Sequence, residues 1–165
     1  MNTAENRTHT ITWKNPKPLA ETSRKLSGMD FMQQIMAGDV PPPPIMLLMN
    51  GRPGKVSEGE VIFEAEPAEY HYNPIGSIHG GFAATMLDTV MGCAIHTTLP
   101  AGVAYTTLEI KINYLRPLTD GIGTVFCHGT AIHVGGRVAT AEGKIVDAEG
   151  KLYATGTTTC LLMRQ

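Results

Sequence analysis

The segment GGFAATMLDTVMGCAIH, residues 80–96, carries one formally charged side chain, that of Asp88, among apolar and small residues. On a helical wheel, at about 100° per residue, its apolar residues fall in one broad sector. This sector holds Phe82, Ala83, Met86, Leu87, Val90, Met91 and Ala94. The segment is therefore predicted to form one long helix with this sector buried, and the helix decides the fold.

Asp88 shares the opposite sector with Thr85, Gly92 and His96. A lone Asp on an amphipathic helix is more often a solvated residue than a functional one. This sector, however, lacks the further charges of a solvated helix face, which favours a surface covered by a second subunit or a ligand. The sequence His-Gly-Gly at residues 79–81 also provides backbone N–H groups that can stabilise negative charge on a carbonyl oxygen.

Strand-like segments lie on both sides of this helix. Residues 60–67, EVIFEAEP, alternate in polarity, and residues 104–117, AYTTLEIKINYLRP, read as a long amphipathic strand. Residues 123–163 provide two or three more strands, with turns at 135–136 and 147–150. One long helix within a run of strands predicts an α+β domain in which an antiparallel sheet wraps around a central helix.

The first forty residues are predicted to form an N-terminal arm with a short helix, which divides the chain into 1–40 and 41–165. Residues up to about 20 are polar and contain two prolines, which indicates a loosely held segment. Residues 27–38, SGMDFMQQIMAG, predict a short amphipathic helix with Ser27 as N-cap and Gly38 as its end. The four prolines at 41–44 predict an extended spacer.

The composition favours one soluble domain of 165 residues, with 42% hydrophobic and 17% charged residues. A net charge of −2, with scattered Lys and Arg, predicts no binding of nucleic acid or anionic membrane. We expect no membrane span, because no apolar run is long enough, and no export, because the N-terminus lacks a signal-peptide core. The three cysteines form no C-x-x-C pair and the histidines show no ligand spacing, which predicts a cytoplasmic protein without a metal.

Three segments resemble the hotdog-fold acyl-CoA thioesterases of the phenylacetic-acid-degradation type. They are HYNPIGSIHGGFAATMLDTVMGCAIH (71–96), YTTLEIKINYLRP (105–117) and HVGGRVATAEGKIVDAEGKLYATGTTT (133–159). The resemblance runs from about residue 41 to 162. It implies a single hotdog domain at 41–165 that hydrolyses acyl-CoA to the free acid and CoA. No cofactor is implied, because CoA is part of the substrate.

The resemblance also assigns roles to particular positions. Asn73 matches the Asn that holds the thioester or its water, and Gly80 matches the Gly whose N–H polarises the thioester carbonyl. Asp88 matches the catalytic carboxylate, and Thr106 matches the hydroxyl that positions water. Thr107 is adjacent, but strand alternation places it on the opposite face, so Thr106 is preferred.

The spacing of Gly80 and Asp88 predicts an assembly. Eight residues of helix rise about 12 Å, so these two residues of one chain cannot both contact one thioester carbon. Two helices that meet antiparallel would bring Gly80 of one subunit near Asp88 of the other. The sequence therefore predicts a homodimer with two equivalent shared sites, or a tetramer built from it.

Two routes are open for the chemistry: Asp88 acts as general base on water, or it attacks the carbonyl and forms an anhydride. Arg116, and Arg137 beside Gly136, are the expected contacts of the CoA phosphates. His79 is expected to position the turn before the helix, with proton transfer as the alternative. Cys93 is expected to be a core residue.

Two other functions compete with thioester hydrolysis. A hotdog acyl-thioester dehydratase or hydratase would use His79 with Asp88 as its catalytic pair. A non-catalytic acyl-CoA binding domain would keep the site without the chemistry. Residues 46–49 and the apolar side chains of 31–36 are expected either to line an acyl pocket or to belong to the core.

Overall fold

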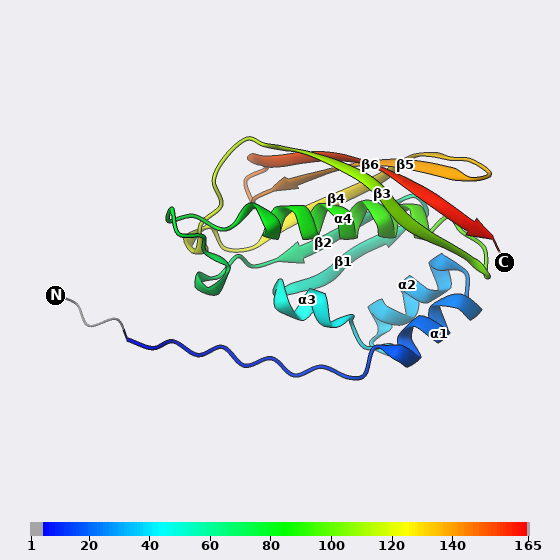
Figure 1. The fold of residues 1–165 in the computed structure, drawn as a ribbon, viewed down its shortest axis with the longest axis horizontal. Helices are drawn as coiled ribbons and strands as arrows, with labels where there is room; N and C mark the ends of the chain where they lie inside the picture. The colour runs from blue at the N-terminus through cyan, green and yellow to red at the C-terminus, as the bar shows by residue number, and fades with distance from the viewer. Residues whose placement is uncertain (1–4, 165) are drawn as a thin grey trace.

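A six-stranded sheet wraps around one long helix, α4 (Gly80–His96), in the computed structural model, which describes residues 5–164 (Figure 1). The strand order is β1-β2-β4-β5-β6-β3, and every neighbouring pair is antiparallel. The strands are β1 (Gly51–Ser57), β2 (Glu60–Ala65), β3 (Val103–Tyr114), β4 (Val125–Val134), β5 (Val138–Val146) and β6 (Leu152–Arg164). The predicted α+β fold, with an antiparallel sheet around a central helix, is confirmed.

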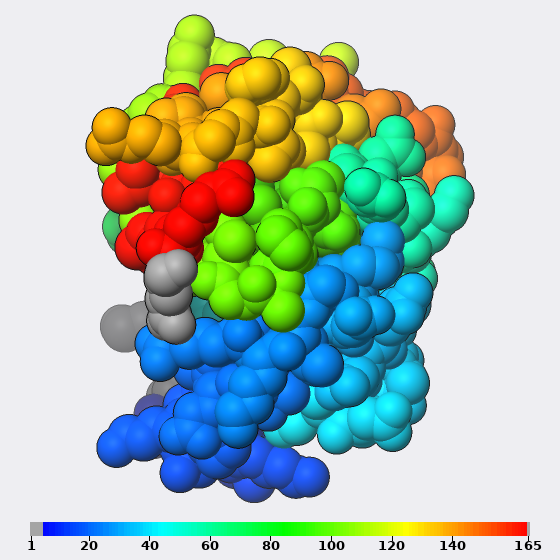
Figure 2. Space-filling view, turned by 90° about the vertical axis from the view of Figure 1, so that its right-hand side faces the viewer, coloured from blue at the N-terminus to red at the C-terminus, as the bar shows by residue number. Residues whose placement is uncertain are grey.

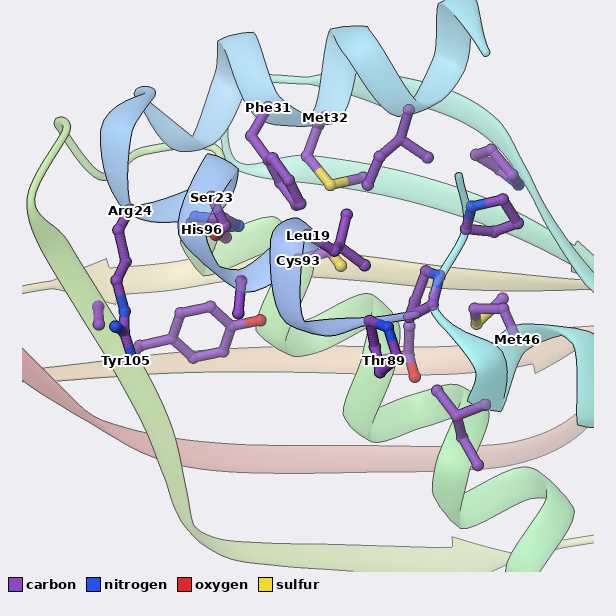
Figure 3. A pocket seen from close by; sticks show the side chains of 18 of the residues that line it. Leu19, Ser23, Arg24, Phe31, Met32, Met46, Thr89, Cys93, His96 and Tyr105 are labelled. Atoms are coloured by element: carbon purple, nitrogen blue, oxygen red, sulfur yellow. The ribbon is translucent and has the colours of Figure 1, made fainter. Parts of the chain in front are cut away.

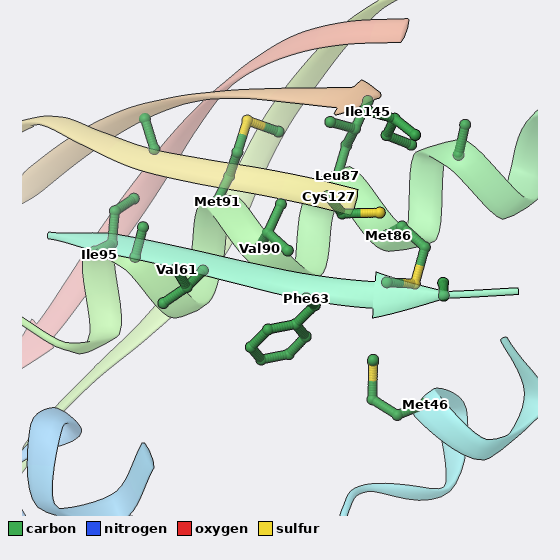
Figure 4. Close-up of a cluster of buried hydrophobic side chains, with 14 of the residues drawn as sticks. Met46, Val61, Phe63, Met86, Leu87, Val90, Met91, Ile95, Cys127 and Ile145 are labelled. Carbon is green, nitrogen blue, oxygen red and sulfur yellow. The ribbon is translucent and has the colours of Figure 1, made fainter. Parts of the chain in front are cut away.

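The apolar sector of α4 forms the centre of the core, as predicted. Leu87, Val90 and Met91 are completely buried, and the inward side chains of β2, β4 and β5 pack around them (Figure 4). Burying a side chain of this size stabilises the fold by about 1.5–3 kcal/mol. The alternation predicted for β2 is also present, because Val61 and Phe63 are buried.

A row of glycines lets the sheet approach α4 closely. Gly129 of β4 pairs with Gly143 of β5, which pairs with Gly156 of β6. A Cβ atom at Gly129 would collide with the Val90 carbonyl of α4, and Cβ atoms at Gly143 and Gly156 would press on Leu87 and Met91. The three glycines therefore form a shallow channel across the sheet in which the helix lies.

The two edge strands of the sheet differ in how well the sequence predicts them. β1 was not predicted, because its sequence GRPGKVS contains Pro53 and two glycines. An edge strand tolerates proline, since one side of its backbone needs no partner. β3 forms the other edge, and within residues 5–164 its outer side pairs with no strand.

Three helices precede the sheet: α1 (Lys17–Lys25), α2 (Gly28–Ala37) and α3 (Pro44–Leu48). The predicted helix at 27–38 is confirmed as α2, with Ser27 as N-cap and Gly38 in the left-handed conformation at its end. The prediction of a loose arm through residue 20 is wrong from Lys17 onward, and Pro44 begins a helix instead of ending a spacer. Proline at the start of a helix is favourable, because its fixed φ suits the first turn.

Figure 2 shows α1 and α2, in blue, against the end of α4, in green, with the later strands on the opposite side. The helix thus lies between the sheet and the N-terminal helices. Two short 3₁₀ helices, Glu69–His71 and Asp120–Ile122, flank the turn that leads into α4. Within the described residues, no helix has both the length and the hydropathy that a bilayer span requires.

Replacing Gly129 with Ala is expected to destabilise the protein by about 2 kcal/mol or more, because the added methyl group meets the backbone of α4. Gly121→Ala is the matched control, since a Cβ atom there meets nothing within 4 Å, and its effect should stay within about 0.5 kcal/mol. Urea unfolding of the two variants measures both values. Equal stabilities would show that the contact between Gly129 and α4 does not constrain the fold.

Candidate active site

Asp88 lies on α4 away from the core, and its carboxylate is exposed in the single chain. The hydroxyl of Thr107, on β3, donates a 2.8 Å hydrogen bond to Asp88 Oδ1. Thr107 is half-buried, so the contact joins the helix to the inner face of the edge strand. Asp88 and Thr107 form a polar pair at the boundary between the core and solvent.

The hydroxyl that contacts Asp88 is that of Thr107, whereas the resemblance assigns the water-positioning role to Thr106. Thr107 pairs with Cys160 of β6, but the next paired residue of β3 is Glu109, so Leu108 forms a bulge. A bulge inserts one residue and reverses the alternation of faces. The inward residues are therefore odd-numbered before Leu108 and even-numbered after it, and Thr106 is exposed.

Gly92 and His96, which share the Asp88 sector, are covered by the same chain. A Cβ atom at Gly92 would lie 2.9 Å from the Tyr105 ring of β3. His96 is buried between Phe31 of α2 and Tyr105, with ring centroids 5.6 and 5.4 Å away. This burial lowers the pKa of His96, so the imidazole is neutral at pH 7. Gly92 and His96 are therefore buried without a second subunit, whereas the side chain of Asp88 remains exposed.

A pocket of about 380 Å³ lies at the N-terminal end of α4, and we call it the second pocket to distinguish it from the larger cavity beside Asp88. It is lined by Asn73, His79, Gly80 and Arg116. His79 caps the helix, because its Nδ1 accepts a 2.9 Å hydrogen bond from the Gly81 N–H. Within residues 5–164 no acceptor is found for the Gly80 N–H, as is usual in the first turn of a helix. This donor is oriented by the helix and remains available.

Asn73 organises the loop that leads to the second pocket. Its Oδ1 accepts hydrogen bonds from the N–H groups of Ile75 and Ser77, at 3.1 and 3.2 Å. Its side-chain amide donates to Ser77 Oγ at 3.1 Å, which uses one of its two N–H donors. Tyr114 of β3 also donates a 3.2 Å hydrogen bond to the Gly80 carbonyl. The hydrogen bonds of Asn73 thus fix the loop, and that of Tyr114 connects the end of β3 to the start of α4.

The predicted site residues fall into two groups in one chain. Asn73, His79 and Gly80 line the second pocket, whereas Asp88 lies farther along α4, where it contacts Thr107 of β3. Eight residues of helix separate Gly80 from Asp88, a rise of about 12 Å. One chain therefore supplies the two halves of the predicted site without joining them.

The two arginines expected to contact CoA lie at opposite ends of β6. The Arg116 N–H donates to the Tyr153 carbonyl, and the Leu162 N–H donates to the Arg137 carbonyl. Nine residues of strand separate Tyr153 from Leu162, which is about 30 Å. Both arginines are exposed, and Gly136 lies beside Arg137 in the open turn between β4 and β5. One chain cannot bring both arginines to one CoA molecule.

Burial raises the pKa of the thiols, which favours their protonated form. Burial, together with the nearby charge of Asp88, raises the pKa of Cys93 to about 12, and burial raises that of Cys127 to about 12. Cys93 packs against the core, as expected. Within residues 5–164 no group of three or more His, Cys, Asp or Glu residues is placed to bind a metal ion.

An antiparallel sheet wrapped around one long helix is the architecture of a hotdog-fold protein. Sequence comparison places it within that class. A model of the thioesterase superfamily matches residues 75–154. Human acyl-coenzyme A thioesterase 13 is 33% identical over 102 residues, which is 59% of this chain and 69% of that protein. The chain belongs to the thioesterase superfamily.

Other similar proteins agree with this assignment. A Halobacterium salinarum protein named provisionally as an esterase is 36% identical over 89 residues, 49% of this chain and 57% of that protein. The match therefore spans little more than half the length of that relative. A phenylacetic acid degradation-related protein of Ralstonia eutropha has a TM-score of 0.72 at 27% identity, covering 78% and 97% of the two chains. A Streptococcus mutans protein solved with acetyl-CoA has a TM-score of 0.63 at 25% identity, covering 70% and 92%.

Replacing Thr107 with Val is expected to lower the rate of thioester hydrolysis by about tenfold or more, because the variant loses the hydrogen bond to the Asp88 carboxylate. Thr106→Val makes the same change one residue away, on the exposed face, and should keep the rate within about twofold. Steady-state kcat of the two variants on one ester decides between them. A larger loss in Thr106→Val would restore the assignment made from the sequence.

Proposed function

We propose that the protein hydrolyses acyl-CoA thioesters to the free acid and CoA at two sites shared between the subunits of a homodimer. Each site would combine Asn73 and Gly80 of one subunit with Asp88 of the other. The observation that carries this proposal is the separation of the two half-sites within one chain. The similarity to acyl-coenzyme A thioesterase 13 and to a protein solved with acetyl-CoA supports the choice of substrate.

The edge strand β3 provides the surface for the proposed dimer. Its outer backbone groups have no partner among the described residues, and such an edge is a template for pairing with another strand. Gly80 contacts Tyr114 near the end of β3, and Asp88 contacts Thr107 seven residues earlier. Antiparallel pairing of two β3 strands, centred between these positions, would place Gly80 of one subunit opposite Asp88 of the other.

The same two-fold pairing would bring Arg116 of one subunit close to Arg137 of the other. Arg116 follows the end of β3, whereas Arg137 is next to the β6 residues that pair with the start of β3. In an antiparallel β3 pair, the end of one strand lies beside the start of the other. Arg116 of one subunit and Arg137 of the other would then flank the same site and could hold the CoA phosphates.

In the proposed reaction, Asp88 takes a proton from a water molecule that the Thr107 hydroxyl helps to hold. The water oxygen attacks the thioester carbon, and negative charge develops on the carbonyl oxygen. The Gly80 N–H, at the positive end of α4, and the remaining Asn73 amide N–H would donate to this oxygen. The carbon–sulfur bond then breaks, and CoA leaves as a thiol after taking up the proton.

Asp88→Asn is expected to lower kcat by roughly 10² to 10⁴, the usual contribution of a positioned general base. Asp39→Asn removes an exposed carboxylate from the loop after α2 and should leave kcat unchanged. Release of free thiol from acyl-CoA esters measures both variants, with far-ultraviolet circular dichroism to confirm that each is folded. Full activity in a folded Asp88→Asn protein would exclude the proposed chemistry.

Coexpression of two inactive variants tests whether the sites are shared. Asn73→Asp keeps the loop hydrogen bonds to Ile75 and Ser77 but removes the amide donor, and Asp88→Asn removes the base. In a mixed dimer with shared sites, one site carries both changes and the other is intact, so about a quarter of the wild-type activity should return. Sites confined to single subunits would return none.

A further inference from the structure

A cavity of about 540 Å³ lies against α4 on the side of Asp88. It extends along the helix past Thr89 and Cys93 to His96, eight residues from Asp88 and a rise of about 12 Å. Figure 3 shows side chains from α1, α2, α4 and β3 converging on this space. We call it the α4 chamber. Its size is within the range of small-molecule pockets, about 300–1,000 Å³.

The walls of the α4 chamber are mainly apolar. They include Leu19 of α1, Phe31 of α2, Met46 of α3 and Phe63 of β2. Among the lining residues, the one carboxylate is Asp88 and the one arginine is Arg24, whose side chain is exposed at the rim. The chamber therefore begins at the proposed catalytic carboxylate and continues into an uncharged interior.

Helix α1 covers this chamber, and its half-buried Leu19 also packs against the core. It contains no buried residue, and its half-buried residues Leu19 and Ser23 line the chamber. Its apolar side thus faces space that an apolar ligand could fill. Helices α1 and α2 also lie outside residues 75–154, the part matched by the family model.

We propose that the α4 chamber binds the acyl group of the substrate and selects uncharged, apolar acyl groups larger than acetyl, with Leu19 and Ser23 of α1 setting their size. This inference rests on the proposed function. The reaction places the thioester carbon beside Asp88, from which CoA extends toward the arginines and the acyl group enters the chamber. Each methylene group buried there raises kcat/KM by about fourfold.

The chamber also disfavours charged acyl groups. A carboxylate at the end of an acyl chain would lose its hydration in the apolar interior, and the one arginine that lines the chamber, Arg24, is exposed to solvent at the rim. Acetyl, by contrast, would leave most of the chamber unfilled. Wild-type kcat/KM should therefore be highest for octanoyl-CoA and phenylacetyl-CoA, and at least tenfold lower for acetyl-CoA and succinyl-CoA.

Ser23→Phe tests the chamber by filling it from α1. It should lower kcat/KM for octanoyl-CoA by at least tenfold and leave that for acetyl-CoA within twofold, because acetyl does not reach Ser23. Glu21→Phe is the matched control, since Glu21 is exposed on α1 and does not line the chamber. It should leave both values unchanged. Leu19→Ala enlarges the chamber, and should shift the preference toward longer acyl groups if Ser23→Phe fails to fold.

The outcomes separate this inference from the proposed function. If the wild type hydrolyses no ester of the panel, the proposed function is wrong, and the proposal that the α4 chamber binds the acyl group is wrong as well. If the wild type is active but Ser23→Phe slows both esters equally, or neither, only the acyl chamber is overturned. A highest wild-type value for acetyl-CoA or succinyl-CoA would overturn it as well.

Discussion

The close contact between α4 and the sheet is the constraint on which the rest of the structure depends. Gly129, Gly143 and Gly156 are side by side on three neighbouring strands, and α4 lies where their missing side chains leave room. Leu87, Val90 and Met91 fill this channel and are completely buried. The helix can neither rotate nor shift without forcing its backbone against the strands or exposing these side chains.

Fixing α4 in this way fixes the chemistry on its other surfaces. The helix start holds the Gly80 N–H at the positive end of the dipole, and the middle of the helix presents Asp88 to Thr107. Because the helix is rigid, the distance between these two groups is fixed as well, and one chain cannot close it. The need for a second subunit in the proposed site follows from the geometry of a single helix.

The N-terminal helices and the sheet have different relations to α4. The sheet encloses the apolar sector completely, whereas α1 and α2 cover the Asp88 side and leave a chamber of about 540 Å³. Tight packing on one side gives stability, and incomplete packing on the other gives a space of defined shape. If the chamber binds the acyl group as proposed, changes in α1 would alter acyl specificity and leave the core unchanged.

Patterns that depend on one element were predictable from the sequence. The extent of α4, the alternation of β2 and the ends of α2 follow from residue periodicity, an N-cap serine and a glycine stop, so local chemistry determined them. The spacing of Gly80 and Asp88 likewise determined that one chain separates them. The sequence does not show that Gly129, Gly143 and Gly156 align across the sheet and make room for α4, because strand register depends on contacts between distant residues.

Features that arise from contact between two elements were decided by the tertiary structure alone. The bulge at Leu108 arises where β3 pairs with β6, and it turned Thr107 inward against the alternation that its own sequence indicates. Strand β1 forms because β2 offers an edge, and α1 forms over a chamber that no local pattern describes. The sequence by itself determined the helix and the residues that it carries. Pairing and packing, which join residues far apart in the chain, decided which of those residues touch.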